Sequence, residues 1–200
     1  MGGNGPMGHS VEGLQRIGVK MFLAGTPPLA AVIPVFHRWI QKGSVDGMLI
    51  DVADYSHVPE GPGVVLVAHE GNYAIDLGGG RPGVLYYRKQ PLAGDLGERL
   101  RGVCAMALQA AALLEKEPSL DGARVRGDEL QIVANDRLLA PNDAETEAAF
   151  RGALDGLLDR MFDGAARQLC RDEDPRERFN VDVKADRGAD AATLLQRLTT

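Results

Sequence analysis

Hydrophobic positions follow two patterns along this chain, one with the period of a strand and one with the period of a helix. The clearest strand pattern is the run Val64 to Val67, which is apolar at every position and predicts a strand buried on both faces. Similar apolar runs, bounded by Gly, Pro or Asp, lie on either side of it along the chain. Together these runs predict strands in the segments 17–25, 47–55, 63–70, 72–77 and 83–89.

The first helical pattern covers residues 29–42, where apolar side chains share one helical face. Pro34 interrupts this pattern, because a proline inside a helix removes a hydrogen-bond donor and clashes with the preceding turn. We therefore expect the regular helix to begin close to Pro34 and to end at Lys42, where Gly43 follows.

Three further helices are predicted in the second half of the chain. Asp95 followed by Glu98 is typical of a capping box and predicts the start of a long helix with an apolar stripe. We expect Asn142 to cap the next helix and Gly164 to end it. A short helix near the C-terminus carries Leu194, Leu195 and Leu198.

The segments between these helices predict more strands. Residues 122–136 are typical of a hairpin that turns at Gly127 and Asp128. Residues 165–170 and 178–185 predict a last pair of strands joined by a charged loop.

The order of the elements favours an α+β fold, since strands come in runs and pairs that are separated by single helices. A chain of 200 residues with 44% hydrophobic residues is long enough to bury one full core. We expect a flexible lead-in over residues 1–13. Residues 14–200 should form a single α+β domain, with a mixed or largely antiparallel sheet packed against three to four helices.

Charge and composition narrow the function classes. The net charge of −6 and the absence of a compact run of Lys and Arg argue against a nucleic-acid partner. No apolar stretch approaches the roughly 20 residues of a membrane helix. We expect a soluble cytoplasmic protein in which Cys104 and Cys170 are reduced core residues.

One group of candidate site residues lies at the end of the most apolar strand. His69 and Glu70 follow it directly and are candidates for an acid and a base in proton transfer. Asp51, Asp54 and His57 lie upstream and offer carboxylate and imidazole ligands for a divalent metal. The alternative is that His69 and Glu70 are hydrogen-bonded structure at a strand end. The sequence identifies no cofactor.

Two arginines are candidates for substrate binding. Arg88 and Arg137 could clamp a small anionic molecule, because the planar guanidinium suits carboxylate and phosphate groups. The alternative for Arg137 is a structural role in which it donates to backbone carbonyls. The glycine-rich segment 77–83 predicts a hairpin turn and not a phosphate loop, since a strand and not a helix follows it.

A candidate interface lies on the first helix. Trp39, the only tryptophan, extends the apolar stripe, and the neighbouring Arg38 points towards solvent or a partner. Core packing is one explanation of Trp39, and an interface hot spot with Arg38 is the other.

Three segments, IPVFHRWIQ, VLVAHEGNY and NDRLLAPND, resemble a family of short bacterial proteins of unknown activity and similar length. The resemblance runs from about Ile33 to Val183. It implies no activity, cofactor or site residue.

Two hypotheses follow from the sequence. The first is a non-catalytic protein that self-associates or binds a protein partner through a sheet edge or the Trp39 helix. The second is a small metal-dependent or acid–base enzyme that binds a small anionic substrate near the end of the Val64–Val67 strand.

Overall fold

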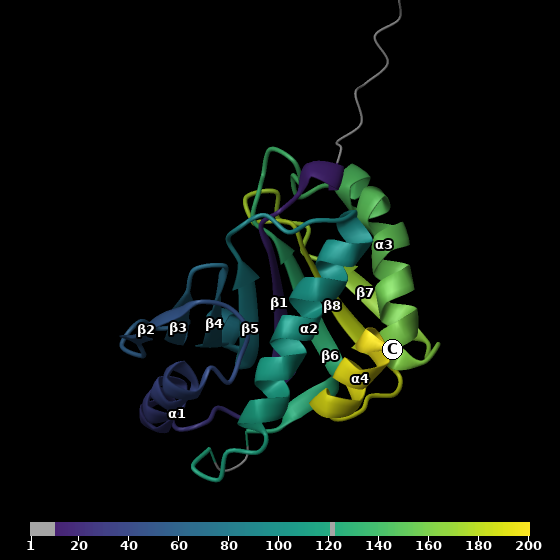
Figure 1. The fold of residues 1–200 in the computed structure, drawn as a ribbon. Coiled ribbons are helices and arrows are strands. Elements are labelled where there is room, and N and C mark those ends of the chain that lie inside the picture. The colour runs from purple at the N-terminus through teal and green to yellow at the C-terminus, as the bar shows by residue number, and fades with distance from the viewer. Residues whose placement is uncertain (1–10, 121–122) are drawn as a thin grey trace, which may run out of the picture.

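The computed structural model describes residues 11–120 and 123–200, which form one layer of sheet and one layer of helices (Figure 1). The described strands are β1 (Ile17–Leu23), β2 (Leu49–Tyr55), β3 (Gly63–Ala68), β4 (Gly71–Asp76), β5 (Gly83–Arg88), β6 (Val125–Ala134), β7 (Arg167–Arg171) and β8 (Asn180–Ala185). The described helices are α1 (Leu29–Lys42), α2 (Leu96–Leu114), α3 (Ala144–Phe162) and α4 (Ala191–Thr199), with the short 3-10 helices η1 (Val11–Gly13) and η2 (Gly78–Gly80).

All strands belong to one sheet in the order β2-β3-β4-β5-β1-β6-β8-β7, and every neighbouring pair is antiparallel. The predicted α+β fold with a largely antiparallel sheet is therefore confirmed. The predicted final strand pair is also present as β7 and β8. No helix of the described chain combines the length and the apolar character needed to cross a membrane.

The central strand β1 is buried along its whole length between β5 and β6. Its side chains alternate between the two faces of the sheet, as in any strand. Val19 and Met21 face the helices and belong to the main apolar cluster, whereas Lys20 and Phe22 face the opposite side. The helices cover only one face of the sheet (Figure 1), and we call the uncovered side the open face.

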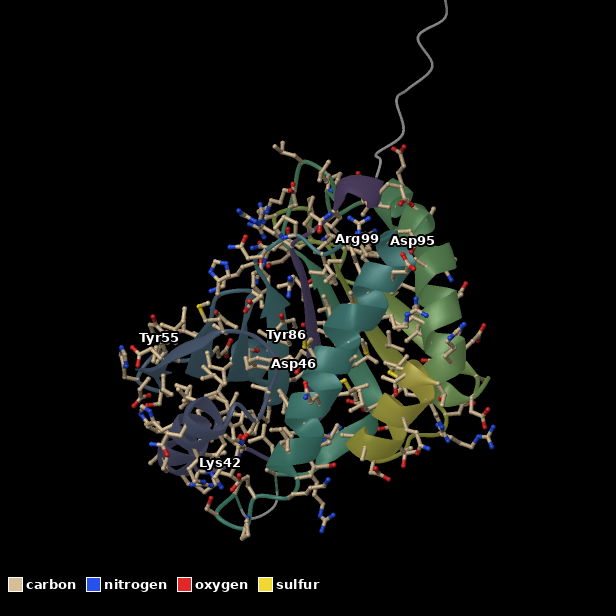
Figure 2. The ribbon with its side chains drawn as sticks, in the orientation of Figure 1. Lys42, Asp46, Tyr55, Tyr86, Asp95 and Arg99 are labelled. Carbon is tan, nitrogen blue, oxygen red and sulfur yellow. The ribbon has the colours of Figure 1, made fainter. Side chains whose placement is uncertain are left out.

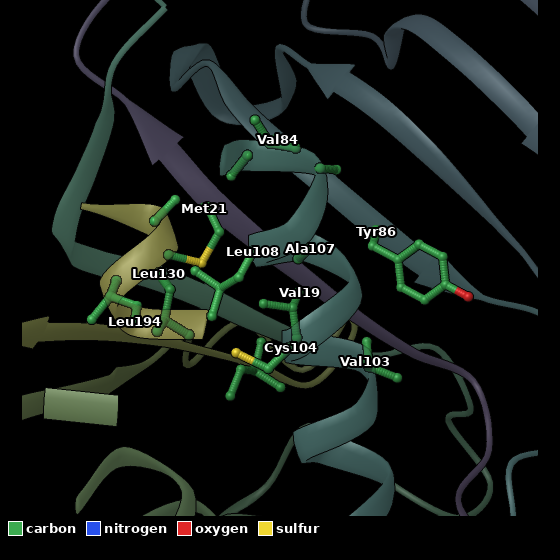
Figure 3. Packing of buried hydrophobic residues seen from close by; sticks show 14 of the residues in the cluster. Val19, Met21, Val84, Tyr86, Val103, Cys104, Ala107, Leu108, Leu130 and Leu194 are labelled. Carbon is green, nitrogen blue, oxygen red and sulfur yellow. The ribbon is translucent and has the colours of Figure 1, made fainter. Parts of the chain in front are cut away.

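The apolar core fills the space between the sheet and the helices. Figure 3 shows Val103 and Ala107 of α2 on either side of Val19 of β1, with Tyr86 of β5 to the right. Cys104 lies in the same layer, where burial raises the pKa of its thiol to about 12. Cys104 is therefore a core residue as predicted, but Cys170, on the edge strand β7, is exposed and not part of the core.

The N-terminal segment is held by a buried arginine of α2. The Arg99 guanidinium donates to the carbonyl oxygens of Leu14 (2.9 Å) and Glu12 (2.5 Å), near the start of α2 (Figure 2). Residues 1–10 of the expected flexible lead-in lie outside the described residues. Residues 11–13 form η1, in which Val11 is buried.

The helix starts follow local capping chemistry. The predicted capping box of Asp95 and Glu98 is present. Helix α3 is capped by Asp143, which accepts from Thr146 N (2.8 Å), and not by Asn142 as predicted. The two positions are adjacent and both carry good capping side chains, so sequence preference alone could not separate them.

Helix α1 begins at Leu29, five residues before Pro34, and the predicted start near Pro34 is wrong. Pro34 lies in the second turn, where its missing N–H leaves the carbonyl oxygen of Ala30 without a helical partner. Ala30 is exposed, so water can hydrate that oxygen. The helix therefore tolerates the proline near its start.

The predicted hairpin at Gly127 and Asp128 is also wrong, since both residues lie inside the continuous strand β6. Gly127 is required for a different reason. A Cβ atom at this position would lie 1.7 Å from the carbonyl oxygen of Ala189, because the segment before α4 crosses the strand there. Only glycine permits this close backbone contact.

We predict that Gly127→Ala lowers the free energy of unfolding by about 2 kcal/mol or more, because the backbone must shift to admit the methyl group. Gly152→Ala is the matched control in α3, where no atom lies within 4 Å of the added carbon. It should raise stability by about 1 kcal/mol through helix propensity. Urea unfolding measures both, and equal stability of Gly127→Ala and the wild type would contradict the contact.

Candidate functional site

Glu70, a predicted catalytic residue, lies in the turn between β3 and β4, and its hydrogen bonds are structural. Its carboxylate accepts from the backbone N–H of Met48 (2.8 Å), and this hydrogen bond is the main cause of its lowered pKa. Its carbonyl oxygen accepts from Lys89 and Gln90. The side chain of His69 is exposed, and its backbone N–H donates to Met48 O (2.9 Å).

The three predicted metal ligands lie along and beyond the edge strand β2. Asp51 accepts from Val52 N (2.8 Å), and Asp54 accepts from Ser56, which lowers the Asp54 pKa. His57 follows the end of β2 that pairs with the start of β3, whereas His69 follows the far end of β3. Within residues 11–120 and 123–200, no group of three or more His, Cys, Asp or Glu side chains could hold a metal.

The two predicted substrate-binding arginines are not brought together. Arg88 is buried, and its guanidinium donates to the carbonyl oxygens of Gln90 (2.8 Å) and Pro91 (3.2 Å). Arg137 lies in the loop after β6 and donates to the carbonyl oxygen of Arg176. Both guanidinium groups are bound to backbone oxygens, as the structural alternative predicted for Arg137, and they do not form an anion clamp.

The prediction that Trp39 of α1 belongs to an interface is wrong, because its side chain is buried. Trp39 is buried in the core, with its ring centroid 5.2 Å from that of Phe36. Arg38 is partly exposed and forms an ion pair with Glu117 (2.5 Å). The tryptophan thus serves core packing, because it faces the sheet together with the rest of the apolar stripe.

The exposed apolar residues gather instead around the edge strand β2, where Tyr55 lies at the outer margin of the molecule (Figure 2). Four of the five large hydrophobic side chains that are exposed in the described chain lie within residues 48–58: Met48, Ile50, Tyr55 and Val58. A free edge strand of this kind is a common place for contact with another chain.

A cavity with a volume of about 740 Å³ lies on the open face. Its lining comes from five strands and four connections, and none of the site residues predicted from the sequence belongs to it. The lining residues are Lys20, Glu60, Gly61, Pro62, Asp76, Gly78, Gly79, Leu85, Tyr87, Gln131, Val133, Asn135, Asp172, Glu177, Arg178 and Asn180.

A buried ion pair lies in the floor of this cavity. Lys20 Nζ is 2.5 Å from Asp76 Oδ2 and donates to the carbonyl oxygen of Gly78 (3.0 Å). Only 4% of the Lys20 side chain is exposed, against 16% of Asp76. The lysine stem occupies the space above Gly83, where a Cβ atom would lie 2.7 Å from two of its carbons. Glycine at position 83 therefore makes room for the pair.

The rest of the floor combines apolar and amide side chains. Leu85 and Tyr87 of β5 and Val133 of β6 are half-buried on the open face. Asn135 Nδ2 donates to the Tyr87 hydroxyl (2.5 Å), and Gln131 Nε2 donates to Asp182 (2.8 Å). These hydrogen bonds fix the orientation of the polar side chains around the apolar centre.

Two connections form the walls. The β2–β3 loop is held beside η2, where Leu77 N donates to Gly61 O (3.0 Å). The β7–β8 loop, residues 172–179, is held by Asn142, whose amide donates to the carbonyl oxygens of Asp172 and Asp174 (2.8 Å each). Arg137 holds the same loop through Arg176. These hydrogen bonds anchor the wall to the rest of the fold.

Comparison of the chain with protein-family models, with curated proteins and with solved structures finds no match. Sequence reasoning missed the cavity because its residues lie on separate strands. One local signal was present: Leu85, Tyr87 and Val133 put apolar side chains on the sheet face that ordinarily carries polar ones.

We predict that Asp76→Ala lowers the free energy of unfolding by about 3 kcal/mol, because it leaves the Lys20 ammonium buried without its counter-charge. Lys20→Met should cost less, about 1 kcal/mol, since the apolar stem is kept and Asp76 still accepts from Gly78 N. Chemical denaturation measures both variants. A larger loss for Lys20→Met than for Asp76→Ala would contradict this description of the pair.

The lowered pKa of Glu70 predicts a pH-dependent contribution to stability. A carboxyl group whose folded pKa is below the ordinary 4.5 stabilises the fold above that pH and loses the contribution as the pH falls through the folded value. Glu70→Gln should therefore lower the melting temperature at pH 7, and the difference should vanish in acid. His69→Ala, which keeps the backbone hydrogen bond, should leave the melting temperature unchanged. A pH-independent effect of Glu70→Gln would be inconsistent with this assignment.

Proposed function

We propose that this protein is a non-catalytic binding protein that takes a small polar molecule into the open-face cavity. The observation that carries the proposal is the cavity itself, about 740 Å³ on the face of the sheet that no helix covers. Binding sites for small molecules ordinarily have volumes of about 300–1,000 Å³. The volume is thus suitable for one such ligand.

The composition of the floor supports ligand binding. Leu85, Tyr87 and Val133 form an apolar centre, and a ligand that covered them would remove apolar surface from water. The amide side chains of Gln131 and Asn135 border this centre and can orient the polar groups of a ligand. Nine charged or amide side chains surround this small apolar centre, so the lining suits a polar ligand.

The chemistry of the lining supports binding over catalysis. Among the described lining residues there is no Cys, Ser or Thr nucleophile and no His, and the Asp76 carboxylate is paired with Lys20. Lys20 is held by Asp76 and by the Gly78 carbonyl oxygen. The proposal places the protein in the cytoplasm, where Cys104 and Cys170 remain free thiols.

We also propose self-association, because four exposed apolar side chains gather at residues 48–58. Asp51 already accepts from the Val52 N–H, so we expect contact with a second copy through side chains and not through a continuous strand ladder. Sedimentation velocity checks this: the wild type should sediment as an oligomer and Ile50→Lys as a smaller species. A monomeric wild type would contradict the proposal.

Thermal shift with a panel of small polar compounds tests ligand binding, using polyamines, amino acids, sugars and dicarboxylates. We predict that at least one class raises the melting temperature of the wild type and has no effect on Val133→Trp, which fills the cavity. Val67→Trp is the matched control, because Val67 is also half-buried on the open face but outside the lining. A compound that stabilises Val133→Trp as strongly as the wild type binds elsewhere and contradicts the proposal, as does a panel without effect.

A further inference from the structure

We propose that the ligand of the open-face cavity is an elongated organic polycation of the linear polyamine type, with charged nitrogens at both ends of its chain. The inference rests on the proposed function and specifies the chemistry of its ligand. Three features of the cavity carry it: the balance of charge, the unused hydrogen-bond acceptors and the separation of the carboxylates.

The charge of the lining favours a cation. Four carboxylates line the cavity against two cationic side chains. Lys20 and Asp76 neutralise each other in the floor, which leaves three carboxylates, those of Glu60, Asp172 and Glu177, and one cation, Arg178, among the other lining residues. The small anionic molecule expected from the sequence would meet net repulsion here, whereas a cation would meet net attraction.

Two unused hydrogen-bonding groups of the floor are acceptors, the amide oxygens of Gln131 and Asn135. The amide nitrogen of Gln131 donates to Asp182 and to Asn180, and that of Asn135 donates to Tyr87. In the part of the chain that the structure describes, no donor reaches the amide oxygen of Gln131 or of Asn135. A ligand rich in N–H donors would satisfy both oxygens.

Glu60 and Glu177 lie in different walls of the cavity. Glu60 belongs to the wall beside η2, near the Gly83 end of β5. Glu177 belongs to the other wall, near Asn135, which donates a hydrogen bond to Tyr87 at the opposite end of β5. The strand between Gly83 and Tyr87 alone spans about 13 Å. The described residues hold no metal-binding group of carboxylates, so the spacing suits separated charges on one long molecule and not a metal ion.

The middle of the cavity suits the methylene chain and the inner ammonium group of such a ligand. Leu85 and Val133 can contact methylene groups, and the face of Tyr87 can lie against an ammonium group. An extended chain of methylenes and ammonium groups therefore meets apolar side chains at the centre, amide oxygens beside them and carboxylates in the two walls.

Isothermal titration of the full-length protein with spermidine tests the inference, with triethylene glycol, an uncharged chain of matched length, and succinate as comparison ligands. We expect spermidine to bind, and Glu60→Gln and Glu177→Gln each to weaken binding roughly two- to five-fold. Glu173→Gln is the matched control, because Glu173 lies in the same loop but not in the lining. Arg178→Gln should strengthen spermidine binding by a similar factor, since it removes a repelling charge.

The outcomes separate this inference from the proposed function. Equal weakening by Glu173→Gln and Glu177→Gln would mean non-specific attraction to an acidic protein and would overturn the inference. Binding of triethylene glycol or succinate in place of spermidine, lost in Val133→Trp, would overturn the polycation and support the cavity as a binding site. Absence of spermidine binding would overturn the inference, and the compound panel would then decide on the proposed function.

Discussion

The buried ion pair of Lys20 and Asp76 is the interaction on which the open face depends. The sheet carries helices on one face only, yet its central strand β1 is buried along its whole length. The middle position of that strand on the open face is a lysine, and a buried ammonium group requires a counter-charge and further acceptors. Asp76 and the Gly78 carbonyl oxygen supply them from the far side of β5. The pair thereby ties β1 to the end of β4 and to η2.

The geometry of the cavity follows from this arrangement. Gly83 has no side chain, which lets the lysine stem cross β5, and the side chains of Leu85 and Tyr87 remain beside it as the floor. The connections at the two ends of the sheet then form the walls, and their backbone hydrogen bonds hold them in place. A site that is formed before its ligand arrives loses less conformational entropy on binding.

Local sequence patterns predicted those elements whose causes are local. The capping box at Asp95 and the strand pair near the C-terminus follow from neighbouring residues. The sequence predicts a turn at Gly127, but the glycine is needed for contact with Ala189. That residue lies about 60 positions later along the chain, so the pattern around Gly127 does not reveal the contact. Contacts between distant segments of the chain cannot be predicted from the spacing of nearby residues.

The candidate site shows the same limit. His69 and Glu70 have residue types common in catalysis, but the sequence could not reveal that the Met48 N–H lies beside the Glu70 carboxylate. The cavity residues come together only through strand order, which places β1 between β5 and β6. Of the predicted site residues, Arg137 alone contributes to the cavity. Its contribution is indirect: it donates to the carbonyl oxygen of Arg176 and so holds the wall loop.

The central claim is that the open face is the binding surface, and mapping of backbone amide chemical shifts by NMR during titration with spermidine tests it most directly. The account predicts changes at Gly61, Tyr87, Gln131 and Glu177, with none along the face of α2 that is directed to solvent. Changes confined to the helices or to the β2 edge would contradict the account, because the ligand would then bind away from the open face.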